Sequence, residues 1–254
     1  HRARRRFGQN FLVDRHVIEA IVRAIDPRAG DALVEIGPGM GALTGLLAEH
    51  VRPLHVIELD RDLARSLAQR LPSATLIVHE ADVLEFDFTM LPAPLRVVGN
   101  LPYNISSPIL FRLFDLAERL LDAHVMLQRE VVERIVAAPD SAAYGRLSVM
   151  LQYRFEVETV LDVGAHAFRP APKVESNVIR LVPRARAQLG ARNVDMLSHV
   201  VQAAFGQRRK MLRNTLRSYF DADQLAALGV DPRARAEELD VDAFVRLANA
   251  ATGA

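Results

Sequence analysis

An asparagine, a proline and a tyrosine follow one another closely after an apolar segment of the chain. The segment RVVG is rich in β-branched residues, as buried strands are, and it continues directly into NLPY (100–103). Pro102 ends the strand, because proline has no backbone N–H to donate and its φ is fixed. Ending a strand requires neither an amide nor an aromatic ring. We therefore expect a reaction site formed by Asn100, Leu101, Pro102 and Tyr103.

These residue types suit methylation of an adenine amino group. The exocyclic N6 is a poor nucleophile because its lone pair is delocalised into the ring, and acceptors for its N–H bonds localise that pair. The side-chain oxygen of Asn100, with a backbone carbonyl beside it, can accept both bonds. Pro102 fixes the geometry of the chain, and the Tyr103 ring can stack on a flipped-out base. No strong general base is needed, because a sulfonium releases its methyl group as a neutral thioether.

A second group of candidate residues follows the earlier strand-like segments. The sequence VEIGPGMG places Gly37 and Gly39 where a strand turns into a helix, and glycine lets the backbone pass close to a ligand. Glu58 ends the next strand-like segment, where an acidic residue can accept hydrogen bonds from ribose hydroxyls, and Asp82 ends the third. These features predict an adenosine-type ligand. NAD and FAD fit them as well as S-adenosylmethionine does, and NLPY favours S-adenosylmethionine.

Only a parallel sheet would bring these strand ends together. Strand-like segments at 32–37, 53–60, 74–82, 94–100 and 123–128 alternate with helical ones, which predicts βαβ units. Two further strands are expected at 155–164 and 176–183, and the chain from about 190 onward has helical periodicity. We predict an α/β fold with a Rossmann-like, seven-stranded methyltransferase domain at 1–184 and a small all-helical C-terminal domain at 185–254.

The composition narrows the class of protein further. The 254 residues include no cysteine, which excludes disulfides and thiolate metal sites and fits a cytoplasmic location. No apolar run is long enough for a membrane span, and no signal peptide is visible at the start. The eight histidines are scattered singly, so we expect no bound metal. Because the first residue is histidine, we expect native residues before it.

Basic residues are concentrated in two segments although the net charge is only +1. HRARRR at the start and FGQRRKMLRNTLR at 205–217 contain no acidic residue, and such segments are typical of a surface that binds a polyanion. The candidate RNA-binding residues are Arg4, Arg5, Arg6, Arg208, Arg209, Lys210 and Arg213.

The motifs also resemble those of a known family. VEIGPGMGALT, VIELDRD, FGQNFLVD, NLPY, MLQREVVERI, YGRLSV, FRPAPKVESNVIRLVP and FGQRRKMLRN look like the bacterial KsgA (RsmA) family of small-subunit rRNA adenine N6,N6-dimethyltransferases. The resemblance runs from about residue 4 to 250. It implies S-adenosylmethionine as cofactor and dimethylation of two adjacent adenosines in the 3′-terminal hairpin of 16S rRNA, within the 30S particle. We expect a monomer.

The resemblance also assigns roles to single residues. It implies cofactor contacts at Asn10, Leu12, Gly37, Glu58, Asp82 and Asn100. Glu58 would bind the ribose hydroxyls, Asp82 the adenine amine of the cofactor, and Asn10 would belong to a segment that closes over the methionine end. Phe168, in FRPAPKVES, is a candidate second stacking face for the target base, and a core position for it is equally compatible with the sequence.

Three other interpretations remain open at this point. An Erm-type enzyme methylates a large-subunit rRNA adenosine by the same chemistry, although FGQRRKMLRN and FRPAPKVES fit the small-subunit family better. A non-catalytic assembly or transcription factor can share the fold, but the presence of Asn10, Glu58, Asp82 and NLPY argues against lost catalysis. A dehydrogenase fits the glycine loop alone and does not explain NLPY.

Overall fold

The computed structural model describes residues 10–72 and 74–252. The chain forms two compact units. The first contains the residues up to Val132 together with Glu156–Pro183, and the second contains Glu133–Phe155 together with the residues from Arg184 onward. The chain thus crosses from one unit to the other close to the boundary expected at residue 184. The second unit, however, also contains Glu133–Phe155, a segment that the sequence predicts to be part of the methyltransferase domain.

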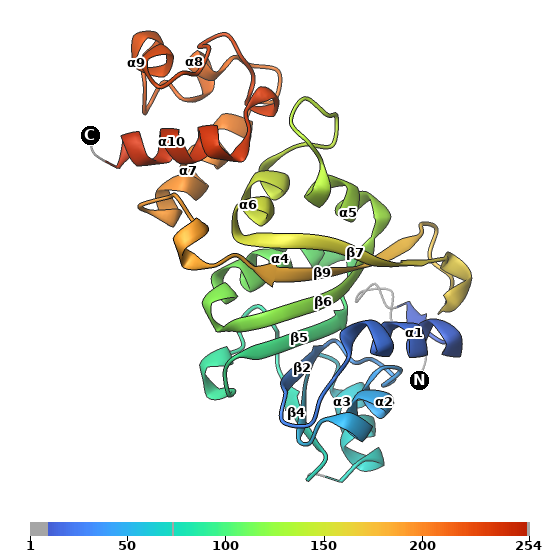
Figure 1. Cartoon of the computed structure of the whole chain (residues 1–254). Coiled ribbons are helices and arrows are strands. Elements are labelled where there is room, and N and C mark those ends of the chain that lie inside the picture. Colours follow the sequence, from blue (N-terminus) through green and yellow to red (C-terminus); the bar gives the residue numbers. More distant parts are fainter. Residues whose placement is uncertain (1–9, 73, 253–254) are drawn as a thin grey trace. The chain divides into compact units, whose positions relative to one another are not determined.

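The first unit is built on a seven-stranded sheet, as the sequence predicts (Figure 1). Its strands lie in the order β4-β3-β2-β5-β6-β9-β7. The pairs from β4 to β6 are parallel, and β9 runs antiparallel to β6. The strand bounds are β2 (Ala32–Ile36), β3 (Leu54–Glu58), β4 (Leu76–Glu80), β5 (Leu95–Asn100), β6 (Leu120–Gln128), β7 (Phe155–Val163) and β9 (Ser176–Pro183).

The strand order reverses between β2 and β5. From β2 the chain moves outward to β3 and β4, and it then returns to β5 on the other side of β2 before continuing to β6. In parallel sheets, ligands bind outside the carboxyl ends of the strands at such a reversal, because the loops there diverge and leave a crevice. The fold therefore predicts a ligand site between the ends of β2 and β5.

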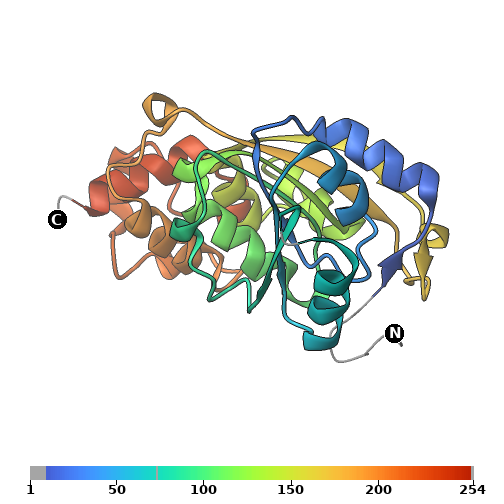
Figure 2. The ribbon, with the colours of Figure 1, turned by 90° about the horizontal axis from the view of Figure 1, so that it is seen from below.

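Helices cover both faces of this sheet. The helices of the first unit are α1 (Arg15–Ile25), α2 (Thr44–His50), α3 (Arg61–Arg70), α4 (Ser106–Asp115) and the first half of α5 (Arg129–Val136). Figure 2 shows α1, in blue, along one side of the sheet and α4, in green, on the other. The β2–α2–β3 and β5–α4–β6 crossovers run in opposite directions across the sheet, so right-handed connections place α2 and α4 on opposite faces. α1 packs on the same face as α2.

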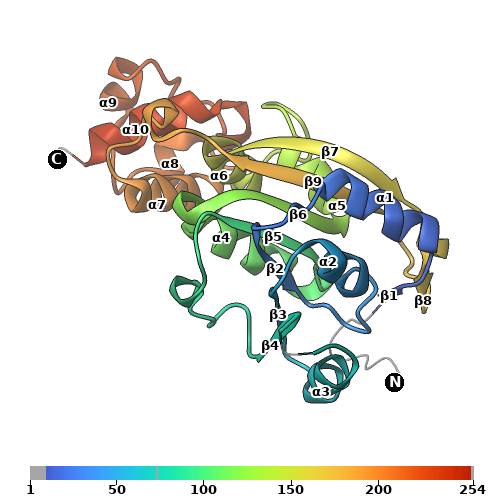
Figure 3. The same ribbon diagram turned by 60° about the horizontal axis from the view of Figure 1, so that its bottom comes forward.

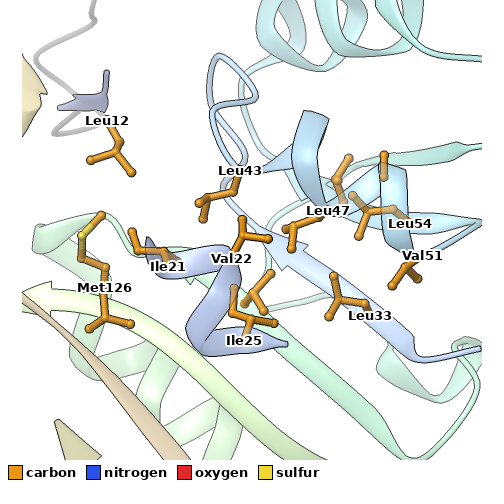
Figure 4. Close-up of a cluster of buried hydrophobic side chains, with 14 of the residues drawn as sticks. Leu12, Ile21, Val22, Ile25, Leu33, Leu43, Leu47, Val51, Leu54 and Met126 are labelled. Carbon is orange, nitrogen blue, oxygen red and sulfur yellow. The ribbon is translucent and has the colours of Figure 1, made fainter. Parts of the chain in front are cut away.

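The apolar stripe of α1 forms part of the core over the sheet. Asp14 caps the helix by accepting hydrogen bonds from the backbone N–H groups of His16 and Val17. The buried side chains of α1 pack with α2 and with the strands below (Figure 4). The labelled members of this cluster include Ile21, Val22, Ile25, Leu33, Leu43, Leu47 and Met126.

A second, two-stranded sheet ties the N-terminal segment to a distant part of the chain. β1 (Phe11–Leu12) pairs antiparallel with β8 (Phe168–Arg169), and Figure 3 shows the two strands side by side. The backbone N–H of Val13 continues the connection by donating to the carbonyl of Ala167 at 2.8 Å. This pairing holds the residues next to Asn10 at a fixed place in the first unit.

The second unit is helical, as expected, but it includes one more helix. Besides α7 (Val194–Phe205), α8 (Leu212–Thr215), α9 (Ala222–Ala227) and α10 (Val241–Ala251) it contains α6 (Arg146–Arg154), which contacts α7 and α10. Seven of the nine residues of α6 are buried. A helix that is buried nearly all round shows no apolar stripe, so its periodicity could not reveal where it packs.

Within the described residues, no helix is both long and apolar enough to cross a membrane.

Candidate functional site

The glycine loop after β2 takes a conformation that glycine favours. Gly37 and Gly39 have φ values of 64° and 59°, in the left-handed region where a Cβ is disfavoured. A Cβ on Gly39 would lie 3.2 Å from a ring carbon of Phe11, so the loop passes close against β1. The backbone N–H of Gly37 donates to the carbonyl of Ile57 at 2.9 Å, which ties the loop to the end of β3.

Glu58 is fixed at the end of β3, where the sequence predicts a ribose-binding acid. Its Oε2 accepts from the backbone N–H of Gly39 at 3.0 Å, and its Oε1 accepts from the N–H of Asp60 at 2.9 Å. Burial raises the pKa of the Glu58 carboxyl, and the two backbone donors oppose that rise. The carboxylate thus bridges the glycine loop and the start of α3, and it lines the pocket described below.

Asp82 follows β4, one strand further from the reversal point. Its Oδ1 accepts from the backbone N–H of Leu84 at 2.9 Å, and the residue is half-buried. Two apolar side chains lie along the same stretch of pocket wall: Val83 is buried, whereas Leu59 is 50 % exposed. A pocket wall that contains both a carboxylate and apolar side chains suits the polar edge and the face of a flat heterocycle.

NLPY begins on the last residue of β5 and continues into a short 3₁₀ turn, Tyr103–Ile105. The backbone N–H of Leu101 donates to the carbonyl of Met126 on β6 at 3.2 Å, and Pro102 has a φ of −58°. Leu101 is buried, while Asn100 and Tyr103 are half-buried. The proline therefore ends the strand and turns the chain along the rim of the pocket.

The side chain of Asn100 is oriented by the N-terminal segment. Its Nδ2 donates to the backbone carbonyl of Asn10 at 3.3 Å. Since the NH₂ group makes this bond, Oδ1 is the atom that remains to accept hydrogen bonds. Asn10 and Asn100, which are distant in sequence, are thus brought together at one wall of the site.

These residues line a single open pocket. Its wall contains Asn10, Leu12, Gly37, Gly39, Glu58, Asp82 and all four residues of NLPY. Every residue that the sequence assigns to the cofactor therefore lies on one cavity, at the edge of the sheet where the strand order reverses. Leu12, which is 5 % exposed, also belongs to the hydrophobic core.

Phe168 is placed differently from the expected stacking role. It is fully buried, pairs with Leu12 across the two-stranded sheet and packs in the hydrophobic core with Val163 and Val178. Phe168 does not line the pocket. It therefore occupies a core position, and the suggestion that it offers a second stacking face to the target base is wrong. The sequence could not separate the two, because an aromatic residue after a strand serves either purpose.

Two polar residues, one in the pocket wall and one bonded to it, are not among those that the sequence predicts. Glu35 lines the pocket, is fully buried and accepts from Oγ1 of Thr44 at 2.7 Å. Burial, opposed by the Thr44 hydrogen bond and assisted by Glu58, raises the pKa of Glu35 to about 7. Ser176 lies 2.8 Å from the Tyr103 hydroxyl. A carboxyl inside the apolar run LVEI was a usable signal for Glu35, whereas nothing in the sequence pairs Ser176 with Tyr103.

The candidate RNA-binding residues differ in their surroundings. Arg208 is engaged within the second unit, where its Nε donates to Glu237 at 3.0 Å and its guanidinium also bonds the carbonyl of Ala142. Arg209, Lys210 and Arg213 are exposed. Arg4, Arg5 and Arg6 lie outside the residues that the structure describes.

The part of the chain that the structure describes holds no group of three or more histidine, aspartate or glutamate side chains that could bind a metal ion.

Comparison with known proteins places the chain in a family. The family model for ribosomal RNA adenine dimethylase matches residues 1–252. A protein of Aromatoleum aromaticum named ribosomal RNA small subunit methyltransferase A is 55 % identical over 98 % of this chain and 94 % of its own length.

Two solved structures are similar in fold. A dimethyladenosine transferase from Plasmodium falciparum has a TM-score of 0.80 at 24 % identity and covers 93 % of this chain and 95 % of its own. The 23S rRNA methyltransferase ErmE has a TM-score of 0.72 at 29 % identity and covers 96 % of this chain and all of its own. We conclude that the chain belongs to the ribosomal RNA adenine dimethylase family and is a methyltransferase.

Proposed function

We propose that this protein uses S-adenosylmethionine to dimethylate N6 of two adjacent adenosines in the 3′-terminal hairpin of small-subunit rRNA. The substrate would be the rRNA within the 30S particle, and the protein would act as a monomer in the cytoplasm, where that particle is assembled. Family membership supports the reaction class. The finer assignment of cofactor and substrate rests on the pocket and on the names of the relatives.

The orientation of Asn100 carries the proposal. Its Nδ2 is committed to the carbonyl of Asn10, so Oδ1 can accept a hydrogen bond from an adenine amino group in the pocket. An acceptor at that amino group draws the lone pair of N6 away from the ring and makes the nitrogen nucleophilic. A dehydrogenase has no use for such an acceptor beside an aromatic ring.

The residues on the other side of the pocket fit S-adenosylmethionine. The Glu58 carboxylate is held by two backbone N–H groups, and a carboxylate offers further lone pairs that two ribose hydroxyls can use. Asp82 lines the same pocket as the apolar side chains of Leu59 and Val83, a combination suited to an adenine ring and its amine. Gly39 has a positive φ, and a Cβ there would meet the Phe11 ring, so glycine lets the loop follow the pocket wall close to β1. When bound, S-adenosylmethionine supplies an electrophilic methyl group on a sulfonium sulfur.

The protein's part in the transfer is to position and polarise the target base. Tyr103 stacks on the flipped-out adenine, and Asn100 Oδ1 accepts one N–H of its amino group. The rigid turn at Pro102 keeps these two groups in register. The methyl group would come from the sulfonium, which would leave as a neutral thioether, so no side chain has to act as a strong base and the proton lost from N6 would pass to solvent. Asn10 and Leu12 close the wall of the pocket next to Asn100.

The names of the relatives favour the small subunit as substrate. The 55 %-identical protein of Aromatoleum aromaticum is named for small-subunit rRNA, whereas ErmE, named for 23S rRNA, is 29 % identical. The exposed cations Arg209, Lys210 and Arg213 supply a surface for the phosphate backbone in either case. A non-catalytic role is disfavoured, because the complete set of Asn10, Glu58, Asp82 and NLPY is not needed by a protein that only binds RNA.

The proposal is tested by offering both subunits to the protein. Purified protein is incubated with radiolabelled S-adenosylmethionine and unmethylated 30S or 50S particles, and the methylated adenosines are mapped. We expect label in 16S rRNA at two adjacent adenosines, with dimethyladenosine as the end product. Label only in 23S rRNA would refute the small-subunit assignment, and label in neither particle would refute the enzyme.

The Asn100→Ala variant tests the role of the acceptor. Without Oδ1 the N6 lone pair stays delocalised, so methyl transfer to 30S particles should fall at least a hundredfold. Binding of 30S particles, measured by sedimentation, should change little because the exposed cations are intact. Retained turnover in this variant would contradict the role of Asn100.

A further inference from the structure

Tyr103 is held by a hydroxyl that comes from a different strand. Its phenolic oxygen lies 2.8 Å from Oγ of Ser176, the first residue of β9. Ser176 is fully buried and does not line the pocket, whereas Tyr103 does. The hydrogen bond is therefore made behind the pocket wall, at the end of the tyrosine ring.

Ser176 lies on a well-anchored part of the sheet. On one side of it, the carbonyl of Glu175 accepts from the backbone N–H of Arg129 at 2.9 Å, and the side chains of these two residues form an ion pair. On the other side, the Asn177 amide donates to Asp162 on β7. The residue also pairs with the last residue of β6 in the antiparallel ladder. Its hydroxyl is thus attached to a frame of three strands.

The main chain around Tyr103 is fixed independently of Ser176. The N–H of Leu101 donates to Met126 on β6, and Oγ of Ser106 donates to the carbonyl of Tyr103 at 3.2 Å. With the backbone held, the freedom left to the ring is rotation about its side-chain torsions. A bond at the far end of the ring removes that freedom, and stacking on a base requires a defined ring plane.

We propose that Ser176 is a positioning residue of the methyl-transfer site, whose hydroxyl holds the Tyr103 ring at the angle at which it receives the target adenine. This inference rests on the proposed function, in which Tyr103 stacks on the base. Ser176 touches neither the base nor the cofactor and acts only through Tyr103. The phenol group contributes a point of attachment, and the ring contributes the stacking surface.

The test is a double-mutant cycle on the complete protein with 30S particles. Ser176→Ala and Tyr103→Phe each break the bond and keep the ring, so each should lower kcat between about tenfold and a hundredfold. The double variant should be no slower than either single variant, because both remove the same hydrogen bond. The dissociation constant for S-adenosylmethionine, measured by calorimetry, should stay within about twofold of wild type. Tyr103→Ala, which removes the ring, should be slower than all three.

A matched control separates positioning from stability. Ser148 is also fully buried and hydrogen-bonded, to the carbonyl of Arg134 in the second unit. Ser148→Ala should lower the melting temperature without changing kcat at a temperature well below the transition.

A residue-specific readout comes from tyrosine labelled with ¹³C at Cζ, since the chain has only four tyrosines. The signal that is absent in Tyr103→Phe should shift in Ser176→Ala, while the other three remain in place.

The outcomes are distinguishable. If the wild-type protein transfers no methyl group to 30S particles, the proposed function itself is contradicted. Active wild-type protein with an unchanged kcat in Ser176→Ala, or with additive losses in the cycle, would overturn the positioning role alone. If the Ser176→Ala chain does not fold, Tyr103→Phe breaks the same bond from the pocket side, and an unchanged kcat there has the same meaning.

Discussion

Two glutamates of the pocket differ in how their charge is compensated. Glu58 accepts hydrogen bonds from two backbone N–H groups, whereas Glu35 is fully buried and accepts one from the Thr44 hydroxyl. The pKa of both carboxyls is raised by burial, and that of Glu35 reaches about 7. At Glu58 the two backbone donors oppose that rise. The charge of Glu35 changes within the neutral pH range.

A pH-dependent stability follows for Glu35. The folded protein holds a proton on this carboxyl at pH values where the unfolded chain, with a pKa of 4.5, has lost it. Stability from this proton is fully present below pH 4.5 and is lost as pH rises towards about 7. Glu35→Gln keeps an acceptor for Thr44 and cannot ionise. Relative to this variant, the wild-type free energy of unfolding should fall by about 3 kcal/mol between pH 4.5 and 8.

Urea unfolding followed by circular dichroism at several pH values measures this difference. Glu49→Gln, which removes an exposed carboxyl from helix α2, serves as the control and should show no such change. Parallel pH profiles for wild type and Glu35→Gln would contradict the prediction.

Single residues were predictable where their position along a strand determines their neighbours. Glu58, Asp82 and Asn100 each stand at or just after the end of a parallel strand, and such ends meet at one edge whatever the loops do. Ser176 could not be assigned in the same way. Its contact with Tyr103 depends on the register of β9 against β6, which only the folded structure fixes.

At the scale of elements, the close contact of β2 and β5 is set by a glycine before NLPY. A Cβ on Gly99 would lie 2.5 Å from the carbonyl oxygen of Ile36, which is backbone and cannot move aside alone. Gly99→Ala should therefore part the two strands at the pocket and lower stability by about 1–3 kcal/mol. The affinity for S-adenosylmethionine should fall with it, since β2 and β5 carry both sides of the site.

Gly45 offers a matched control for this substitution. It lies in helix α2, and a Cβ there would meet nothing within 4 Å. Gly45→Ala should leave cofactor affinity unchanged and raise stability by up to about 1 kcal/mol, because alanine favours the helix. Urea unfolding and calorimetric titration compare the two variants. A Gly99→Ala protein as stable as wild type would disprove the steric argument.

The elements themselves were largely predictable, but the pairing of β1 with β8 was not. Alternating apolar strands and amphipathic helices indicated the five parallel strands and the two later ones. The two-residue strands β1 and β8 are too short to show periodicity, and their partners lie far apart in sequence. The same limitation left the core position of Phe168 undecided, because its burial follows from that pairing.

At the scale of the whole molecule, the exposed cations of the second unit should contribute RNA binding without chemistry. Arg209, Lys210 and Arg213 have no ion-pair partner among the described residues, whereas Arg208 is paired with Glu237. Replacing Arg209 and Lys210 by alanine should weaken 30S binding and flatten its dependence on salt concentration. The slope of log K against log salt should fall by about 0.7–0.9 for each rRNA phosphate that these side chains no longer neutralise.

Binding measured over a range of salt concentrations provides the test. The double variant Arg233→Ala and Arg246→Ala removes the same charge from exposed positions of the same unit and should keep the wild-type slope. Equal slopes in both double variants would show that Arg209 and Lys210 do not bind rRNA phosphates and are ordinary solvent-exposed side chains.

The pairing of β1 with β8 also has a consequence for the order of events during synthesis. Asn10, Phe11 and Leu12 form one wall of the pocket, but the strand that holds them in place is made ~155 residues later. At roughly 5–20 residues per second, that delay is on the order of ten seconds or more. The seven-stranded sheet also waits for β9. A nascent chain therefore cannot present a complete pocket until most of it has left the ribosome, the particle whose rRNA its family methylates.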